Sequence, residues 1–311
     1  MTDRENTANT CPFIESPKNK IIVCGGKSIE TKDFLKSILN DTNDVAYLTL
    51  SSLVQNDISV IPAGVYIIQG GDEVFIDYVK KASTFIFYFP NDFNTFQDTF
   101  ASFSKVYDFI ETYNREINFI FVSTTEVYGK KRTGMLFTDS ELKPGTKRGI
   151  VYQTMEHYVS LLPHYKIIRI PELYTKAVEE EMKSFIAYIK NQSVIKIPSQ
   201  KEYINFIYTE TLNKAIKILI NSQYSTIVHL TDTPNLTFQN FIQSVAKIYG
   251  KKIKYTTKFN FIISTFKIDI PDVFKYDQNL STIEQESLGL EEYRTTEMAV
   301  KELIEKTKNV K

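Results

Sequence analysis

Residues 121–129 read FVSTTEVYG and complete an apolar run that begins at Asn118. The run Asn118–Val122 (NFIFV) predicts a buried β-strand, because it is short and continuously apolar. Three hydroxyl residues follow it directly: Ser123, Thr124 and Thr125. Ligands of open α/β sheets sit outside the carboxyl ends of the strands, so these hydroxyls are candidates for a binding site.

Apolar runs and helical patterns alternate along the first half of the chain. The runs predicted as strands are 20–26, 45–50, 65–69, 84–89, 118–122 and 165–170. The segments with helical spacing are 31–39, 74–82, 96–113 and 152–162. The alternation indicates a parallel sheet with right-handed crossovers, and the apolar strands indicate helices on both faces. We therefore predict an α/β fold with a doubly wound, Rossmann-like parallel sheet.

The pattern changes after Pro171. Shorter strands are predicted at 194–197, 225–230 and 252–255, and helices at 179–190, 212–220, 238–249 and 296–306. The predicted organisation is a disordered leader at 1–18, a Rossmann-like dinucleotide-binding domain at 19–170 and a smaller mixed lobe at 171–311. We expect the lobe to bind substrate, with elements near 203–222 returning to the first domain.

Composition narrows the function. The 311 residues include 37 Lys+Arg and 37 Asp+Glu, so the formal net charge is zero and no bulk attraction to nucleic acid or anionic membrane is expected. Two cysteines and three histidines give no disulfide framework and no metal site. The first 18 residues are polar, and no apolar run approaches the roughly 20 residues that span a bilayer. We expect a cytoplasmic protein that binds a small molecule.

Two turns are candidates for cofactor binding. Gly25 and Gly26 end the first strand, and Ser28 follows close behind, which suits a phosphate turn at the start of a helix. Glu30 places a negative charge near that turn, so a plain strand-to-helix turn is equally supported. Asp72 follows the third strand and suits hydrogen bonding to an adenine amino group, but Asp is also a favoured helix N-cap.

The hydroxyl run and a later tyrosine suggest acid–base chemistry. Carbonyl reduction or alcohol oxidation needs a proton donor and a group that holds the carbonyl oxygen. Tyr152 and Thr124 have the residue types for these two roles, and Tyr152 lies at the predicted start of a helix. The alternative is a threonine-rich loop and a packing tyrosine, one of 19 in the chain.

The string FVSTTEVYG, with Tyr152 beyond it, resembles the extended short-chain dehydrogenase/reductases, the NAD-dependent epimerase/dehydratase family that acts on nucleotide sugars. It is especially similar to the sugar-nucleotide 4,6-dehydratases, whose string reads STDEVYG. The resemblance implies NAD or NADP as cofactor, a nucleotide sugar as substrate, Thr124 as catalytic hydroxyl and Glu126 as the dehydratase glutamate. Thr125 stands where that family has an aspartate.

The likeness covers about residues 19–306, through segments 167–174, 203–215 and 288–290. It also implies a homodimer as one arrangement, because the segments 96–113 and 152–162 match the helices that pair in the family. The oligomeric state stays open.

Two segments depart from the family. Its Tyr-x-x-x-Lys motif is here Tyr152-Gln153-Thr154-Met155-Glu156. We expect Glu156 to disfavour the tyrosinate, because it faces the same side of the helix four residues on. In the fourth strand, Phe87-Tyr88-Phe89-Pro90 replaces small residues, and we expect these aromatics to fill cofactor space.

Three functions therefore remain open, the last of them a structural scaffold of this fold that binds no nucleotide. The first is an NAD(P)-dependent nucleotide-sugar epimerase, dehydratase or reductase with Tyr152 as acid/base. The second is a catalytically inactive protein of the same fold, a pseudoenzyme that binds a nucleotide sugar or acts as a regulatory partner subunit. Fold alone does not decide between them, because function depends on the site.

Overall fold

The computed structural model describes residues 19–25, 29–40, 43–49, 61–69, 73–88, 96–174, 176–198, 202–222, 224–234, 236–256, 276–293, 298, 300–301 and 304–305. The predicted leader 1–18 lies outside these residues, as do Gly26, Ser28 and Asp72, so the predictions for them stay predictions. Of the predicted last helix, the described residues 298, 300–301 and 304–305 are helical.

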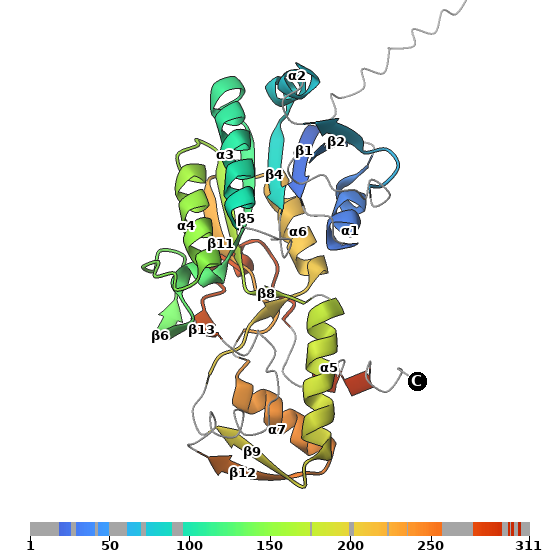
Figure 1. Cartoon of the computed structure of the whole chain (residues 1–311), viewed down its shortest axis with the longest axis vertical. Helices are drawn as coiled ribbons and strands as arrows, with labels where there is room; N and C mark the ends of the chain where they lie inside the picture. The colour runs from blue at the N-terminus through green and yellow to red at the C-terminus, as the bar shows by residue number, and fades with distance from the viewer. Residues whose placement is uncertain are drawn as a thin grey trace, which may run out of the picture.

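A seven-stranded parallel sheet forms the upper part of the molecule (Figure 1). Its strands are β1 (Asn19–Gly25), β2 (Asn43–Thr49), β3 (Tyr66–Gln69), β4 (Thr84–Tyr88), β5 (Asn118–Thr124), β7 (Tyr165–Ile170) and β11 (Thr226–His229). They lie in the order β11-β7-β5-β4-β1-β2-β3, and each neighbouring pair is parallel. The predicted doubly wound α/β fold is confirmed.

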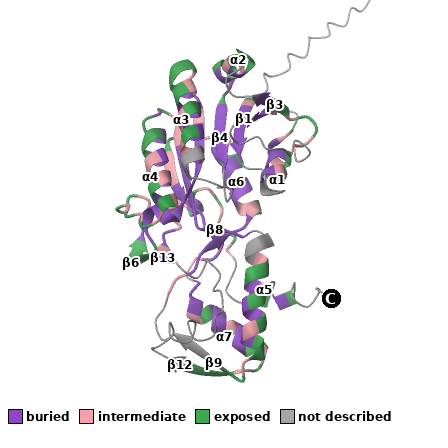
Figure 2. Cartoon of the chain, viewed as in Figure 1, coloured by how far each residue is buried: buried purple, intermediate pink, exposed green. Residues whose placement is uncertain are grey.

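Successive side chains of these strands enter two different cores. Figure 2 shows strands such as β1 and β4 in purple, as buried. On one face, residues such as Phe85 and Phe119 pack under α2 (Glu73–Lys81), α3 (Phe96–Tyr113) and α4 (Lys147–Val159). On the other, residues such as Ile86 and Ile120 pack under α1 (Ile29–Ile38) and α6 (Thr209–Ile220). Burial on both faces explains why the strands read as continuous apolar runs.

A third core lies below the sheet (Figure 1). Its helices are α5 (Lys176–Asn191) and α7 (Phe238–Ile248), and its strands β9 (Val194–Pro198) and β12 (Lys252–Thr256) pair in parallel. Between the large sheet and this third core, β8 (Glu172–Leu173) pairs with β10 (Phe206–Ile207) (Figure 1). β11 belongs to the large sheet, so the chain returns to it after residue 171. The domain boundary itself stays a prediction.

Four short elements near the sheet have no counterpart among the predicted ones. They are the 3₁₀ helix η2 (Thr125–Tyr128), the parallel pair of β6 (Lys131–Leu136) with β13 (Asp277–Leu280), and α9 (Ile283–Ser287). The sequence hides them because strands and helices this short carry too few residues for a periodic pattern. They nevertheless hold much of the site.

The predicted start of the helix at Tyr152 is wrong. α4 begins at Lys147, because Thr146 caps it: the Thr146 hydroxyl accepts a hydrogen bond from the Gly149 amide at 2.9 Å. Tyr152 therefore lies in the second turn. Gly149 allows α4 to approach η2 closely, since a Cβ at this position would lie 2.7 Å from the Glu126 carbonyl oxygen.

The aromatic residues at the end of β4 are core residues. Phe87 packs edge-on against Phe103, with ring centroids 5.4 Å apart. Tyr88 stacks on Phe34 at 4.7 Å, on the opposite face of the sheet. Both are buried, so they fill the cores on the two faces of the sheet, whereas Phe89 and Pro90 lie outside the described residues.

Among the described helices, none is long and apolar enough to cross a membrane.

Candidate functional site

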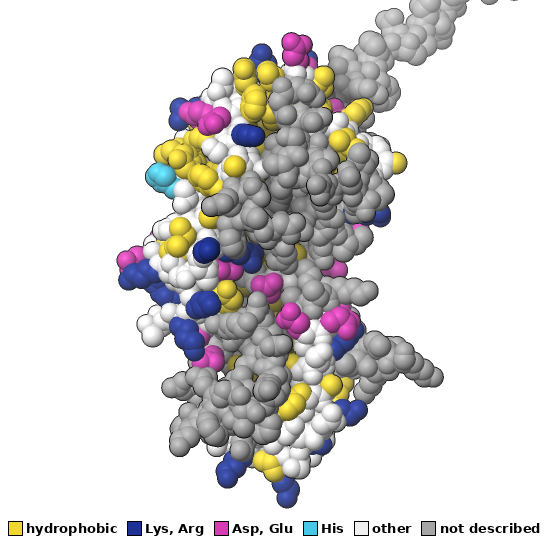
Figure 3. All heavy atoms as spheres, viewed as in Figure 1, with side chains coloured by type: hydrophobic (Ala, Val, Ile, Leu, Met, Phe, Trp, Pro, Cys, Tyr) yellow, Lys and Arg dark blue, Asp and Glu magenta, His cyan; other side chains and the backbone are white. Residues whose placement is uncertain are grey.

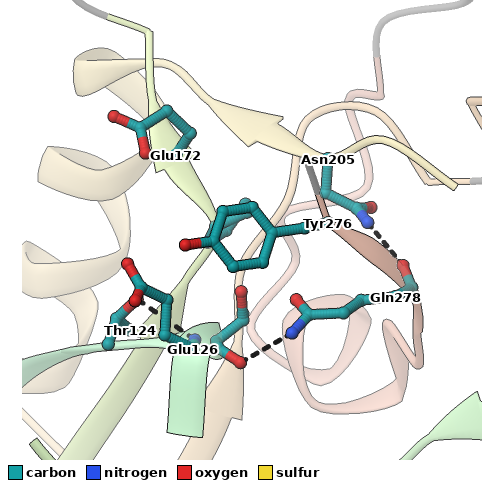
Figure 4. A pocket seen from close by; sticks show the side chains of 8 residues that line it. Thr124, Glu126, Glu172, Asn205, Tyr276 and Gln278 are labelled. Atoms are coloured by element: carbon teal, nitrogen blue, oxygen red, sulfur yellow. Dashed lines mark hydrogen bonds between the residues drawn. The ribbon is translucent and has the colours of Figure 1, made fainter. Parts of the chain in front are cut away.

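A small pocket opens where β5 and β7 end (Figure 4). Its lining comes from the β5 end, η2, the β8–β10 pair and β13: Thr124, Thr125, Glu126, Pro171, Glu172, Asn205, Tyr276 and Gln278. The free space at its centre is about that of one water molecule. The pocket lies at the carboxyl edge of a doubly wound sheet, where ligands of such folds bind.

Thr124 and Glu126, two of the three predicted catalytic residues, both line this pocket. The Thr124 hydroxyl caps η2 by accepting a hydrogen bond from the Glu126 amide at 3.2 Å. The Glu126 carboxylate accepts a hydrogen bond from the Thr146 hydroxyl at 2.5 Å and lies 3.3 Å from an Arg148 nitrogen. The Glu126 charge adds to burial in raising the pKa of Tyr276, which lines the same pocket. The Glu126 carboxylate is thus fixed by Thr146 and Arg148 at the pocket wall.

Tyr152, the third predicted catalytic residue, lies in the hydrophobic core. It is 2% exposed and stacks on Phe121, with ring centroids 5.6 Å apart. Burial raises the pKa of its hydroxyl well above the usual value. The nearby guanidinium of Arg148 lowers this pKa in part, and the Glu126 charge raises it. Tyr152 is not among the described residues that line the pocket.

Glu156 takes part in a buried ion pair. Its carboxylate accepts hydrogen bonds from the Arg169 Nη2 at 2.8 Å and Nε at 3.0 Å, and from the Ser123 hydroxyl at 2.5 Å. The side chains of Glu156 and Arg169 are only 4% and 3% exposed. The expected action of Glu156 on Tyr152 is therefore corrected: burial is the main cause of the raised pKa, and the contributing carboxylate is Glu126.

The ion pair continues into a longer polar chain. Arg169 also donates hydrogen bonds to the Tyr128 hydroxyl and, at 2.7 Å, to the Thr138 carbonyl. The Tyr128 hydroxyl lies 2.7 Å from His229 Nε2, and His229 Nδ1 lies 3.2 Å from the Ser281 carbonyl. That carbonyl can only accept, so Nδ1 carries the proton and Nε2 accepts from Tyr128. Burial, assisted by Arg169, lowers the pKa of His229 to about 4.

The residues present fit the expected dinucleotide only in part. Gly25 ends β1 at a close approach, because a Cβ there would lie 2.9 Å from the Tyr88 carbonyl oxygen. Gly26, Ser28 and Asp72 lie outside the described residues. Position 156, where the resemblance implies a lysine that grips the cofactor ribose, holds a carboxylate already bonded to Arg169 and Ser123. Position 156 therefore provides no cation that would hold the nicotinamide end of NAD(P).

Several residues of the site were not predicted from the sequence: Arg169, Glu172, Asn205, His229, Tyr276 and Gln278. The sequence does carry a signal for Arg169. This arginine lies inside the apolar run YKIIRI, and a buried arginine needs an acidic partner. Gln278 holds η2 by donating from Nε2 to the carbonyls of Thr125 and Gly129, at 2.8 and 2.6 Å. Such a contact across about 150 residues leaves no local pattern in the sequence. The described residues contain no cluster of His, Cys, Asp or Glu able to hold a metal ion.

Comparison with solved structures agrees with the fold. The chain is similar to dTDP-glucose 4,6-dehydratase from Bacillus anthracis in complex with NAD, with TM-score 0.63, 14% identity, and coverage of 94% of this chain and 97% of that one. It is also similar to the Bordetella bronchiseptica enzyme WbmG in complex with NAD, with TM-score 0.65 and 11% identity. That match covers 96% of this chain and 96% of that one. A third similar structure is UDP-glucose 4-epimerase with UDP-glucose from Thermotoga maritima, with TM-score 0.59 and 14% identity. That match covers 93% of this chain and 100% of that one.

The sequence itself matches no protein-family model and no curated protein. The similar structures are NAD-dependent epimerases and dehydratases, as the resemblance of FVSTTEVYG indicated. At 11–15% identity this likeness establishes the shared fold.

Proposed function

We propose that this chain binds a nucleotide sugar on the epimerase/dehydratase fold and does not use Tyr152 as an acid/base. The observation that carries the proposal is the buried pair of Glu156 and Arg169, which occupies the position where the resemblance implies a cofactor-gripping lysine. The pocket that contains Thr124 and Glu126 supports ligand binding beside it. UDP-glucose in the Thermotoga maritima epimerase supports this ligand class.

The state of Tyr152 supports the loss of proton transfer. An acid/base works best when its pKa lies near the working pH, whereas burial raises the pKa of Tyr152 above its usual value of about 10. Each further pKa unit costs about 1.4 kcal/mol for forming the tyrosinate, or a factor of ten in its population. Stacking on Phe121 also holds the ring in the core.

Titration calorimetry with UDP-glucose, in the presence and absence of NAD or NADP, tests the proposal. We expect saturable binding of UDP-glucose that does not depend on either dinucleotide, and no change in nicotinamide absorbance with time. We expect Tyr152→Phe to leave the dissociation constant within about twofold, because the hydroxyl lies outside the pocket. Turnover that Tyr152→Phe abolishes would contradict the proposal.

One observation favours the alternative, an active NAD(P)-dependent enzyme. The Arg148 guanidinium lies 5.7 Å from the Tyr152 ring centre and lowers the pKa of the hydroxyl. Arg148 places a cation beside the tyrosine from the first turn of α4, whereas the lysine of the family would come from position 156 in the third turn. Arg148 also pairs with Glu126, so its charge is shared. For this reason we rank the active enzyme second.

The cytoplasmic location stays a prediction from the sequence.

We further propose that the chain forms a homodimer through α3 and α4. Hydrophobic side chains gather over the edge where these helices lie (Figure 3). Ile150 and Tyr158 on α4 and Leu161 just after it are 52%, 39% and 50% exposed, and patches of exposed apolar side chains mark interaction sites. We expect Ile150→Glu to turn a dimer into a monomer in sedimentation velocity.

The control for this test is Ile283→Glu, which changes an isoleucine that is 61% exposed on α9. The control variant should keep the oligomeric state of the wild type. A wild-type chain that sediments as a monomer at high micromolar concentration would contradict the homodimer.

A further inference from the structure

The strand pair β9 and β12, with the carboxyl ends of α5 and α7, forms the lower end of the molecule (Figure 1). Ile195 of β9 is 4% exposed and belongs to the third core, so its side of the strand pair faces the protein. The parallel register places Val194 beside Lys252, each one residue before the pair of Ile195 with Ile253. Because successive side chains of a strand point to opposite faces, Val194, Lys252 and Lys254 point away from the core.

Lysines are concentrated at this end of the molecule. Residues 184–198 and 236–256, which build it, contain six lysines and no Arg, Asp or Glu, although the whole chain has 37 residues of each sign. Five of these lysines have described side chains, and none of the five is buried: Lys190, Lys247, Lys251, Lys252 and Lys254. Within the described part of the chain, the ion pairs on α5 join Lys183 to Glu179 and Glu180, and none uses these five lysines. We call the five lysines the lysine tip.

The positive charge of the lysine tip acts locally. At physiological salt the Debye length is about 8 Å, so acidic residues on distant elements are screened from the tip. The formal net charge of zero removes the attraction of the chain as a whole to anionic partners. It leaves the local attraction of the tip in place.

Apolar side chains are exposed at the same end of the molecule. Four of them are exposed by 42%, 37%, 39% and 56%: Val194, Ile248, Ile253 and Tyr255. Figure 3 shows dark blue and yellow side chains next to one another at this end. Aliphatic groups gain by leaving water, whereas a lysine can bury its stem and keep its ammonium group hydrated. The lysine tip therefore combines positive charge with apolar surface.

This combination fits one class of anionic partner better than another. Recognition of nucleic acid relies largely on the planar fork of arginine and on aromatic rings that stack with bases. The segments that build the tip contain no arginine, and three of its four exposed apolar side chains are aliphatic. A bilayer with anionic lipids offers charged head groups at its surface and hydrocarbon directly beneath them. Lysine and aliphatic side chains on one end of a molecule match both layers.

We propose that the lysine tip docks this chain reversibly on a membrane surface that carries anionic lipids. The lysines lie at the head groups, and the exposed aliphatic side chains lie at the boundary of the hydrocarbon. Each lysine near such a surface strengthens binding about fivefold, so the loss of two should weaken it about 25-fold. The candidate pocket lies at the carboxyl edge of the large sheet, away from this end, so the tip is a separate site.

Flotation of the full chain with lipid vesicles tests the proposal. Vesicles rich in phosphatidylserine should bind the chain and vesicles of phosphatidylcholine alone should not, and added salt should weaken the binding. The double variant Lys252→Gln, Lys254→Gln should bind about 25-fold more weakly. The matched control Lys36→Gln, Lys217→Gln removes two exposed lysines from α1 and α6. It should change the binding by less than about twofold.

Val194→Ser separates membrane docking from attraction by charge alone. It keeps every lysine and removes apolar surface from the outer face, so it should weaken vesicle binding at least about threefold. Circular dichroism checks the fold of each variant. If Lys252→Gln, Lys254→Gln is unfolded, Lys190→Gln, Lys247→Gln takes its place, since both of these lysines are exposed on helices.

Several results would overturn membrane docking by the lysine tip. They are the absence of binding to phosphatidylserine vesicles, equal binding to both kinds of vesicle, and binding of the folded lysine variant as tight as that of the wild type. Wild-type affinity of Val194→Ser for vesicles would likewise overturn it. An acidic peptide or a single-stranded oligonucleotide that binds while the vesicles do not would assign the tip to that partner instead.

Discussion

Replacing Arg169 with methionine is expected to lower the free energy of unfolding by about 3–5 kcal/mol. Arg169 is 3% exposed and bonds to Glu156 through two of its nitrogens. Without the guanidinium, the Glu156 carboxylate stays buried with no cation beside it, and a buried unpaired charge is costly. Tyr128 and the Thr138 carbonyl lose a donor as well. Urea unfolding followed by circular dichroism measures the change.

The double variant Glu156→Met, Arg169→Met separates the charge effect from the loss of packing. Well-packed apolar residues often replace a buried ion pair at little cost, because both charges leave together. We expect the double variant to recover at least about half of the stability lost in Arg169→Met, although Ser123 then loses its acceptor. An equally unstable double variant would show that the other bonds of Arg169 carry the effect.

The surface pair of Lys81 with Asp77 is the matched control. Its atoms are 2.7 Å apart, but the two side chains are 57% and 63% exposed. Water screens such a pair, so Lys81→Met should change the free energy of unfolding by less than about 1 kcal/mol. A small loss of stability in Lys81→Met beside a large one in Arg169→Met would show that burial of the ion pair causes the difference.

The elements of the large sheet could be predicted from sequence because each strand is an apolar run buried on both faces. The run YKIIRI shows the limit of that approach. It predicts β7 correctly, but it says nothing of how its two charged residues are accommodated. Arg169 pairs with Glu156, whereas the fully buried Lys166 amino group has no hydrogen-bond partner among the described residues. Whether a charged residue of a buried strand is paired depends on residues of other elements, which the strand's own sequence does not reveal.

The candidate site could be predicted only in part, for the same reason. Thr124 and Glu126 were found because they follow a strand in one local string, and both line the pocket. Tyr276 and Gln278 reach the pocket from a segment about 150 residues away, in a two-stranded sheet with little pattern. The change from lysine to glutamate at 156 was visible in sequence, but its consequence required the position of Arg169. A departure from a motif thus became interpretable only through its tertiary partner.

Acid is expected to destabilise the protein through His229. Burial lowers the pKa of His229 to about 4, against an ordinary value of 6.5. Above pH 6.5 the ring is neutral in both the folded and the unfolded chain, and it adds no pH dependence. Between pH 6.5 and about 4 only the unfolded chain binds the proton, so stability falls with pH. The loss from this one group reaches roughly 3 kcal/mol at pH 4, at about 1.4 kcal/mol per pKa unit.

The variant His229→Gln isolates this contribution from that of the carboxylates. Its amide nitrogen and oxygen replace the donor and the acceptor of the ring, and it does not titrate. Urea unfolding at pH 7, 6, 5 and 4 should show a smaller loss of stability for His229→Gln than for the wild type, by about 2–3 kcal/mol at pH 4. His157→Gln, a change of an exposed histidine on α4, should follow the wild-type curve. Parallel curves for all three proteins would mean that His229 accepts a proton in the folded state as readily as in the unfolded one. The bond to Tyr128 would then have to reverse, because protonated Nε2 can no longer accept, and the Tyr128 hydroxyl would donate to the Phe137 carbonyl 3.0 Å away instead. The bond from Nδ1 to the Ser281 carbonyl would stay as it is.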